Sequence, residues 1–260
     1  MKKSSTGSLS QPGEGQSEGD PESALFTHAK NAIDQEQTRM RREGAQQFAL
    51  TLSEETVSQF ATFIAEIQRW STIADLLSQT DPATLIRKHI LDSLALLPWI
   101  PQGSRVLDLG SGAGFPGLPL AIAAPGISVT LIEARRKRAN FLKASIRTLG
   151  LRNVNAYEGR AEHLSHEDTL QAAFDIIVTR ATWSIALFLT LARPFLRPDG
   201  IVMAMKGPKL QQELEELRDD IEKTGFSHTD TKAYTLAGNA QRNIAFFSRT
   251  SVPKKLLINL

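Results

Sequence analysis

Short apolar runs alternate with segments of helical periodicity between residues 104 and 224. The short runs predict five strands, at 106–109, 129–132, 154–157, 174–178 and 201–205. The segments between and after them predict helices at about 116–124, 136–149, 184–193 and 208–224. Strands that alternate with helices are typical of an α/β fold with a mostly parallel, doubly wound sheet. We expect this sheet to occupy residues 101–250.

The flanking segments follow other patterns. Residues 46–100 carry apolar side chains at helical spacing, which predicts a helical lead-in packed on the sheet. After Gly225, strand-like stretches at 227–234 and 243–249 follow each other without a helix, which predicts an antiparallel hairpin at the sheet edge. We expect residues 1–45 to be a disordered or weakly ordered leader, because 1–23 are rich in Ser, Gly, Gln and Glu. Residues 251–260 form a tail.

The composition limits the chemistry that is open to the chain. Its 260 residues have a formal net charge of +2 and no cysteine, which excludes thiolate catalysis, disulfides and cysteine-bound metals. Residues 1–36 carry six acidic and three basic side chains, so 37–260 carry a net positive charge that permits an anionic partner. No signal-peptide core is present, and no stretch approaches the roughly 20 apolar residues of a membrane span. We therefore expect a cytoplasmic protein that is not bound to a membrane.

The stretch 106–117 is the candidate ligand site. It reads Val-Leu-Asp-Leu-Gly-Ser-Gly-Ala-Gly-Phe-Pro-Gly, a strand that turns through glycines into a helix. Gly110 and Gly112 allow positive φ and let a ligand approach the bare backbone. Residues 112–117 also satisfy the G-x-G-x-x-G pattern of dinucleotide-binding loops, so two cofactor classes are open.

Two carboxylates near the loop favour S-adenosylmethionine as the cofactor. Asp108 would repel a pyrophosphate but attract the ammonium or sulfonium group of S-adenosylmethionine. Alternatively, Asp108 only hydrogen-bonds the loop backbone. Glu133 ends the second strand, where a carboxylate can accept both ribose hydroxyls of an adenosyl group. Its alternative role is to cap the following helix.

Further candidates follow the third and fourth strands. Ala161 and Glu162 can hold an adenine ring through a backbone amide and a carboxylate. Arg180 ends the fourth strand, where methyltransferases of exocyclic amines need Asn or Asp before Pro-Pro and an aromatic residue, a sequence that this chain lacks. An arginine here indicates a contact to a phosphate, a carboxylate or a base edge, or else a surface ion pair. Trp183 can stack on a base or lie in the core.

Basic side chains gather at the start of the second crossover helix, at Arg135, Arg136, Lys137 and Arg138. Basic residues at a helix N-terminus oppose the helix dipole, so stability alone does not favour them. We interpret them as an RNA-facing surface, with a merely solvated face as the alternative. His89 and Asp92 share a helix face and can form a polar pair, but without a third ligand nearby we expect no metal site.

Together these segments resemble the bacterial ribosomal small-subunit methyltransferase G family, also called glucose-inhibited division protein B. The resemblance covers roughly residues 48–250. It rests on these segments: 107–120, His-Ile-Leu-Asp-Ser-Leu at 89–94, Lys-Arg at 137–138 with Phe-Leu at 141–142, Arg-Ala-Glu at 160–162, Arg-Ala at 180–181 and Met-Lys-Gly at 205–207. It implies a Rossmann-like fold, S-adenosylmethionine as cofactor, and methylation of N7 of one guanine in 16S ribosomal RNA. It also implies cofactor contacts at Gly110, Phe115, Ala161 and Glu162, with Arg180 at the active-site end.

This reaction needs no general base, because guanine N7 has an exposed lone pair, so catalysis should come from alignment. We predict that Arg180 positions the substrate and also borders the cofactor, and that Lys206 joins the RNA contacts. The expected partner is 16S ribosomal RNA or the small ribosomal subunit, bound by a monomer. Two alternatives are an NAD(P)-dependent oxidoreductase, based on 112–117, and a non-catalytic RNA-binding module, based on the basic helix start.

Overall fold

The structure is a computed structural model that describes residues 26–28, 30–31, 33–35, 51–181, 183–236 and 238–249. Within these residues seven strands form one sheet in the order β3-β2-β1-β4-β5-β7-β6. The strands are β1 (Arg105–Leu109), β2 (Ser128–Glu133), β3 (Val154–Glu158), β4 (Phe174–Thr179), β5 (Leu196–Lys206), β6 (Phe226–Leu236) and β7 (Ala240–Arg249).

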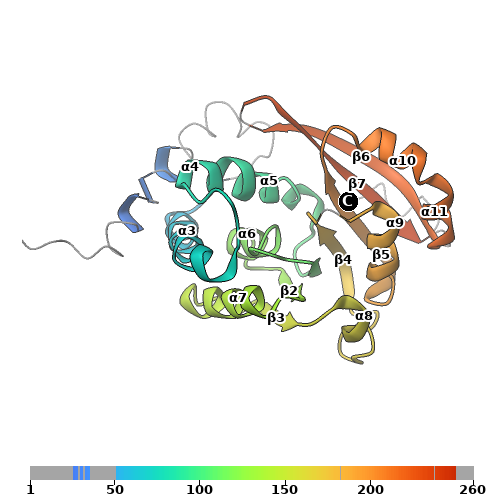
Figure 1. Cartoon of the computed structure of the whole chain (residues 1–260), viewed down its shortest axis with the longest axis horizontal. Helices are drawn as coiled ribbons and strands as arrows, with labels where there is room; N and C mark the ends of the chain where they lie inside the picture. Colours follow the sequence, from blue (N-terminus) through green and yellow to red (C-terminus); the bar gives the residue numbers. More distant parts are fainter. Residues whose placement is uncertain are drawn as a thin grey trace, which may run out of the picture.

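Helices cover both faces of the sheet. They are α3 (Glu54–Ala74), α4 (Pro82–Leu85), α5 (Leu91–Leu94), α6 (Gly117–Ala123), α7 (Arg136–Thr148), α8 (Ala161–Leu164), α9 (Ile185–Ala192), α10 (Leu210–Glu216) and α11 (Arg218–Lys223), with a π-helical turn at Ile86–Ile90 and a 3-10 turn at Leu97–Trp99. Figure 1 shows α3 to α7 on the left of the sheet and α8 to α11 on the right, with β6 and β7 forming a long hairpin.

The sheet separates two hydrophobic clusters. Val106 of β1 lies in the cluster with α3, α6 and α7, whereas Leu107, the next residue, lies in the cluster with α9 and α10. Strands buried on both faces have continuous apolar sequences, which explains the short apolar runs. None of the described helices is long and apolar enough to cross a membrane.

The predicted architecture is confirmed. β1 pairs in parallel with β2 and β4, and the outer pairs β2–β3 and β4–β5 are also parallel. β7 runs antiparallel to both β5 and β6, as the predicted edge hairpin requires. Helix α3 begins as its sequence suggests, because Ser53 accepts a hydrogen bond from Thr56 N and two glutamates follow in the first turn.

Three local predictions differ from the structure. The helix expected at 208–224 is split into α10 and α11 at Leu217, whose φ of −104° and ψ of 12° leave the helical region. Helix α8 was not predicted, because a single turn is too short to show helical periodicity. Part of the leader is packed: residues 26–28, 30–31 and 33–35 are helical, and Ile33 is buried in the core. The expectations for 1–23 and 251–260 lie outside the described residues.

Candidate functional site

The glycine loop joins β1 to α6 where the carboxyl ends of β1, β2 and β4 meet. The amides of Gly110 and Ser111 both donate to Ile132 O of β2, at 3.0 and 3.1 Å. Thr179 Oγ1 of β4 donates to Leu109 O at 3.0 Å. Gly110 has a φ of +77°, and a Cβ on it would lie 2.7 Å from the Trp183 ring. Only glycine therefore fits at this position.

A cavity of about 870 Å³ opens above this loop. Its size suits a small-molecule cofactor, for which about 300–1,000 Å³ is usual. The structure brings most of the predicted site residues into its lining, namely Gly110, Gly112, Phe115, Glu133, Arg135, Arg138, Ala161, Glu162 and Arg180. The predicted residues Asp108, Arg136, Lys137 and Lys206 lie outside that lining.

Glu133 links the glycine loop to the start of α7. One of its carboxylate oxygens accepts from Gly112 N at 2.9 Å, and the other accepts from Arg135 N at 2.7 Å. Glu133 also lines the cavity, as a ligand contact requires. It does not cap α7 as the alternative proposed, because the N-cap is Arg135 and has no side-chain cap hydrogen bond. Each carboxylate oxygen has two lone pairs, so each can accept one more hydrogen bond from a ligand hydroxyl.

Asp108 lies beneath the loop. Its side chain is buried, and its Oδ2 accepts from Gly117 N at 2.9 Å. Its Oδ1 has no hydrogen-bond partner among the described residues. Burial raises the pKa of Asp108 to about 7, although the Gly117 N–H opposes that shift. This geometry favours support of the loop backbone over direct contact with a ligand.

Arg180 is held at the rim of the cavity by the helical lead-in. Its Nη1 lies 3.3 Å from Asp92 Oδ2, and its Nη2 lies 2.5 Å from His89 Nδ1. Its guanidinium also sits 5.1 Å from the centre of the Phe115 ring, within cation–π range. Burial lowers the pKa of Arg180, and the charge of Asp92 opposes that shift. The surface ion pair considered from the sequence is thus an ion pair in the cavity wall.

His89 stays neutral beside Arg180. Burial, together with the positive charges of Arg180 and Lys88, lowers the pKa of His89 to about 4. A neutral imidazole that faces a guanidinium accepts a hydrogen bond, so Nδ1 carries no proton and Nε2 does. His89 and Asp92 do share one face, as predicted, but each contacts Arg180.

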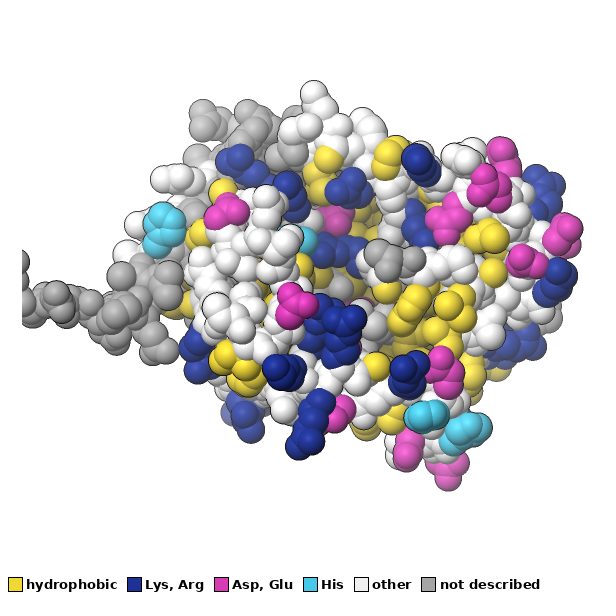
Figure 2. All heavy atoms as spheres, in the orientation of Figure 1, with side chains coloured by type: hydrophobic (Ala, Val, Ile, Leu, Met, Phe, Trp, Pro, Cys, Tyr) yellow, Lys and Arg dark blue, Asp and Glu magenta, His cyan; other side chains and the backbone are white. Residues whose placement is uncertain are grey.

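The predicted basic surface is present in part. Arg135, Arg136 and Lys137 are exposed at the start of α7. Arg138 is half-buried and donates to Asp75 O at 2.6 Å, which ties α7 to the end of α3. Figure 2 shows Lys and Arg side chains gathered over α7, to the left of the hydrophobic side chains over α9.

The prediction for Lys206 needs correction. The Nζ of Lys206 donates to Trp183 O at 2.8 Å and pairs with Glu213 at 2.9 Å, and its side chain is only 13% exposed. Lys206 therefore braces the turn after β4 instead of facing RNA. Trp183, for which base stacking and the core were both open, is half-buried, packs against the core and lines the cavity over Gly110.

The sequence did not indicate several other contributors to the site. Leu76 and Leu77 after α3, and Leu187 and Leu191 on α9, add apolar walls to the cavity. Leu187 is 46% exposed. Helical periodicity alone does not predict that this leucine faces the cavity instead of the core. Tyr234 and Arg242 of the hairpin contact Asp92, but no sequence motif marks them.

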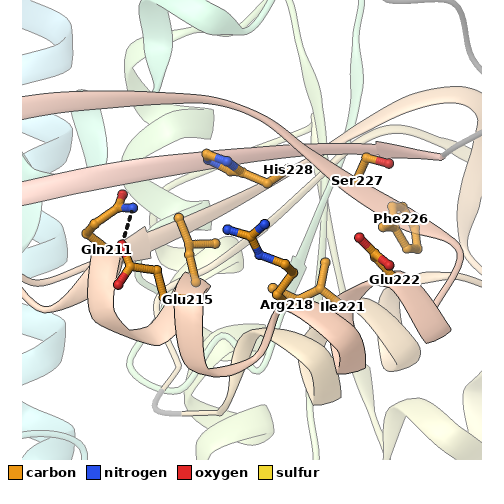
Figure 3. A pocket seen from close by; sticks show the side chains of 9 residues that line it. Gln211, Glu215, Arg218, Ile221, Glu222, Phe226, Ser227 and His228 are labelled. Carbon is orange, nitrogen blue, oxygen red and sulfur yellow. Dashed lines mark hydrogen bonds between the residues drawn. The ribbon is translucent and has the colours of Figure 1, made fainter.

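A second cavity of about 350 Å³ lies away from the glycine loop, between α10, α11 and β6. Figure 3 shows Gln211 and Glu215 of α10 side by side, with Arg218 and Glu222 of α11 nearby. Gln211 donates to Glu215 at 2.9 Å. The carboxyl ends of the parallel strands are absent from the lining of this second cavity. Since ligands of open α/β sheets bind at those ends, we assign the functional site to the larger cavity.

The chain is similar to known proteins of one family. The family model for rRNA small subunit methyltransferase G matches residues 56–245. A Ribosomal RNA small subunit methyltransferase G from Sorangium cellulosum is 42% identical over 170 residues, 64% of this chain and 71% of the relative. A protein of the same name from Syntrophus aciditrophicus is 33% identical over 213 residues, 81% of this chain and 88% of the relative.

Two solved structures share the fold. TYW2 of M. jannaschii in complex with AdoMet has a TM-score of 0.50 at 20% identity and covers 62% of this chain and 76% of its own. A SAM-dependent methyltransferase from Aquifex aeolicus has a TM-score of 0.50 at 17% identity and covers 69% of this chain and 97% of its own. At these identities the likeness concerns the Rossmann-like fold.

Proposed function

This chain belongs to the rRNA small subunit methyltransferase G family, and from that premise we propose that it transfers a methyl group from S-adenosylmethionine to N7 of a guanine in 16S ribosomal RNA. The observation that carries the proposal is the cavity in which the glycine loop, Glu133 and Arg180 meet. Because the chain belongs to this family, we set aside the two alternatives, an NAD(P)-dependent oxidoreductase and a non-catalytic RNA-binding module.

The residues of the cavity fit this cofactor. Gly110 and Gly112 line the cavity with bare backbone, and a Cβ on Gly112 would meet no other atom closer than 4.0 Å. Glu133 offers free lone pairs to ribose hydroxyls, and Ala161 and Glu162 border the same space. When bound, S-adenosylmethionine supplies the methyl group from a positively charged sulfonium. The buried carboxyl of Asp108 lies below the loop and adds negative potential there when it is ionised.

The protein side chains align the acceptor and exchange no proton with it. Both oxygens of Glu133 hold backbone amides, and Nδ1 of His89 is occupied by Arg180. Neither group is poised as a base, and guanine N7 needs none. Holding N7 about 3–3.5 Å from the methyl carbon can account for about 7–11 kcal/mol of barrier reduction. The free guanidinium donors of Arg180 supply this alignment at the cavity rim.

Methylation of isolated small ribosomal subunits tests the proposal. Subunits from a strain that lacks the gene are incubated with the full chain and methyl-labelled S-adenosylmethionine, and the labelled base is mapped. We expect label at N7 of one guanine in 16S ribosomal RNA. Label on another atom or on ribosomal protein, or no transfer at all, contradicts the proposal. Parallel reactions with protein-free 16S ribosomal RNA identify the preferred substrate.

Replacing Glu133 with alanine is expected to weaken binding of S-adenosylmethionine by about 1.5–3 kcal/mol, because a charged acceptor is lost. Glu133→Gln should weaken binding less, because the amide keeps one acceptor oxygen for Gly112 N. Calorimetric titration with S-adenosylhomocysteine measures both changes. Unaltered affinity in the alanine variant, with an intact thermal transition, would leave Glu133 with only its backbone role.

The exposed start of α7 is proposed to contact RNA phosphates. Replacing Arg136 and Lys137 together with alanine should weaken binding to the small subunit and lower the slope of log K against log salt concentration by about two, one for each lost phosphate contact. The double variant should keep its cofactor affinity, because neither side chain lines the cavity. Arg218→Ala on α11, also exposed, is the matched control and should leave the slope unchanged.

A further inference from the structure

We infer that Asp92 and Tyr234 are positioning residues for methyl transfer, and that they act by fixing the guanidinium of Arg180. This inference rests on the proposed function. Neither side chain lines the cavity, and neither is expected to touch RNA or cofactor. Their role follows from a buried polar network that joins α5, the end of β4 and the edge hairpin.

Asp92 is the centre of this network. Its side chain is about 5% exposed, and its two oxygens face different partners. Oδ1 accepts from the Tyr234 hydroxyl at 2.6 Å and lies 3.8 Å from Arg242 Nε. Oδ2 lies 3.3 Å from Arg180 Nη1. A buried carboxylate that is held at both oxygens has one orientation, so Tyr234 determines where Oδ2 points.

Some N–H groups of the Arg180 guanidinium donate to protein atoms, and the others remain for a ligand in the cavity. A guanidinium has five N–H groups in a fixed plane. Nη1 uses its two on Lys88 O and Asp92 Oδ2, and Nη2 uses one on His89 Nδ1. Among the described residues, no acceptor takes up the Nε–H or the second Nη2–H of Arg180. Because the plane is rigid, the contacts to Asp92 and His89 fix the direction of the two remaining donors.

Tyr234 also keeps Asp92 from a competing partner. Arg242 approaches the same oxygen as Tyr234 but is partly exposed on β7, with 32% of its side chain accessible. Without the Tyr234 hydroxyl, the carboxylate can turn toward Arg242 and loosen its hold on Arg180. The expected result is a guanidinium with several orientations, of which only some align the acceptor.

A double-mutant cycle on the full chain tests the inference. Tyr234→Phe, Arg180→Met and the double variant are compared by single-turnover methylation of small subunits at saturating S-adenosylmethionine. We expect Tyr234→Phe to slow transfer about five- to tenfold while affinity for S-adenosylhomocysteine changes by less than about twofold. In the Arg180→Met background, Tyr234→Phe should change the rate by less than about twofold, because residues that act as a unit are not additive.

Controls separate positioning from folding. Tyr157→Phe removes the hydroxyl of a half-buried tyrosine on β3, outside the cavity lining, and should leave the rate unchanged. If Tyr234→Phe loses its thermal transition, Asp92→Asn replaces it in the same cycle. Additive effects of the two substitutions, or a normal rate in Tyr234→Phe, overturn the inference while leaving the proposed function intact. A wild-type chain that transfers no methyl group to the subunit overturns the proposed function itself.

Discussion

Methyl transfer is expected to slow by at least about tenfold when Arg180 is replaced with alanine, a loss above about 1.4 kcal/mol at the transition state. The guanidinium borders the cavity and keeps two donors for the acceptor nucleotide. Affinity for S-adenosylhomocysteine should fall much less. Single-turnover methylation and calorimetry on the same preparation measure the two effects. An equal loss of cofactor binding would move Arg180 into the cofactor site.

The same substitution should also lower the free energy of unfolding. Breaking a buried ion pair costs up to about 3–5 kcal/mol, because the remaining charge loses its partner. Here Asp92 keeps Tyr234 and Arg242, so the cost should lie below that range. Arg180→Lys separates stability from catalysis: it preserves a charge for Asp92 but loses the planar donor pair. We expect it to be more stable than the alanine variant yet still slower than the wild type.

Asp108 is expected to make the protein less stable as the pH rises from about 4 to about 7. Its folded-state pKa of about 7 lies above the usual aspartate value of 3.8, so the folded state holds a proton that the unfolded state has lost. The stabilisation from this proton is fully present below the pKa of Asp108 in the unfolded chain. It is lost as the pH rises through the pKa of Asp108 in the folded protein. At about 1.4 kcal/mol per unit, the full loss is on the order of 4 kcal/mol.

Urea unfolding of the wild type and of Asp108→Asn measures this loss of stability. The pH range runs from about 5 to about 8, because it must span the Asp108 pKa of about 7. The asparagine side chain cannot titrate. As the pH rises, the free energy of unfolding of the variant should therefore increase relative to that of the wild type. Asp199→Asn, at an exposed position, is the control and should track the wild type. Parallel curves for Asp108→Asn and wild type would refute the raised pKa.

Cofactor titration of the same variant decides between the two roles of Asp108. If its charge attracts the cofactor through the loop, as its sequence position suggests, Asp108→Asn should weaken S-adenosylmethionine binding by about 1.5–3 kcal/mol. Support of the loop backbone alone predicts little change, because asparagine keeps an acceptor for Gly117 N.

Local sequence patterns could predict the strands, the hairpin and the glycine loop, because each depends on residues that are close in the chain. Residues at the strand ends, such as Glu133 and Arg180, could also be found, since parallel strands bring their carboxyl ends together. The partners of these residues could not. Asp92 and Tyr234 are separated by 142 positions, and no local rule links them. The burial of Lys206 likewise depends on Glu213 and on the turn at Trp183.

The place of the hairpin in the chain has a consequence during synthesis. β7 pairs with β5, and β6 carries Tyr234, yet both strands leave the ribosome after every residue of the glycine loop. A nascent chain that ends before β6 already has the cofactor loop but leaves β5 as an open edge and Asp92 without its hydroxyl partner. We expect such a chain to bind cofactor before its acceptor site is aligned and to expose an unpaired strand to other chains. Translation of β6 and β7 therefore completes both the described sheet and the alignment of Arg180.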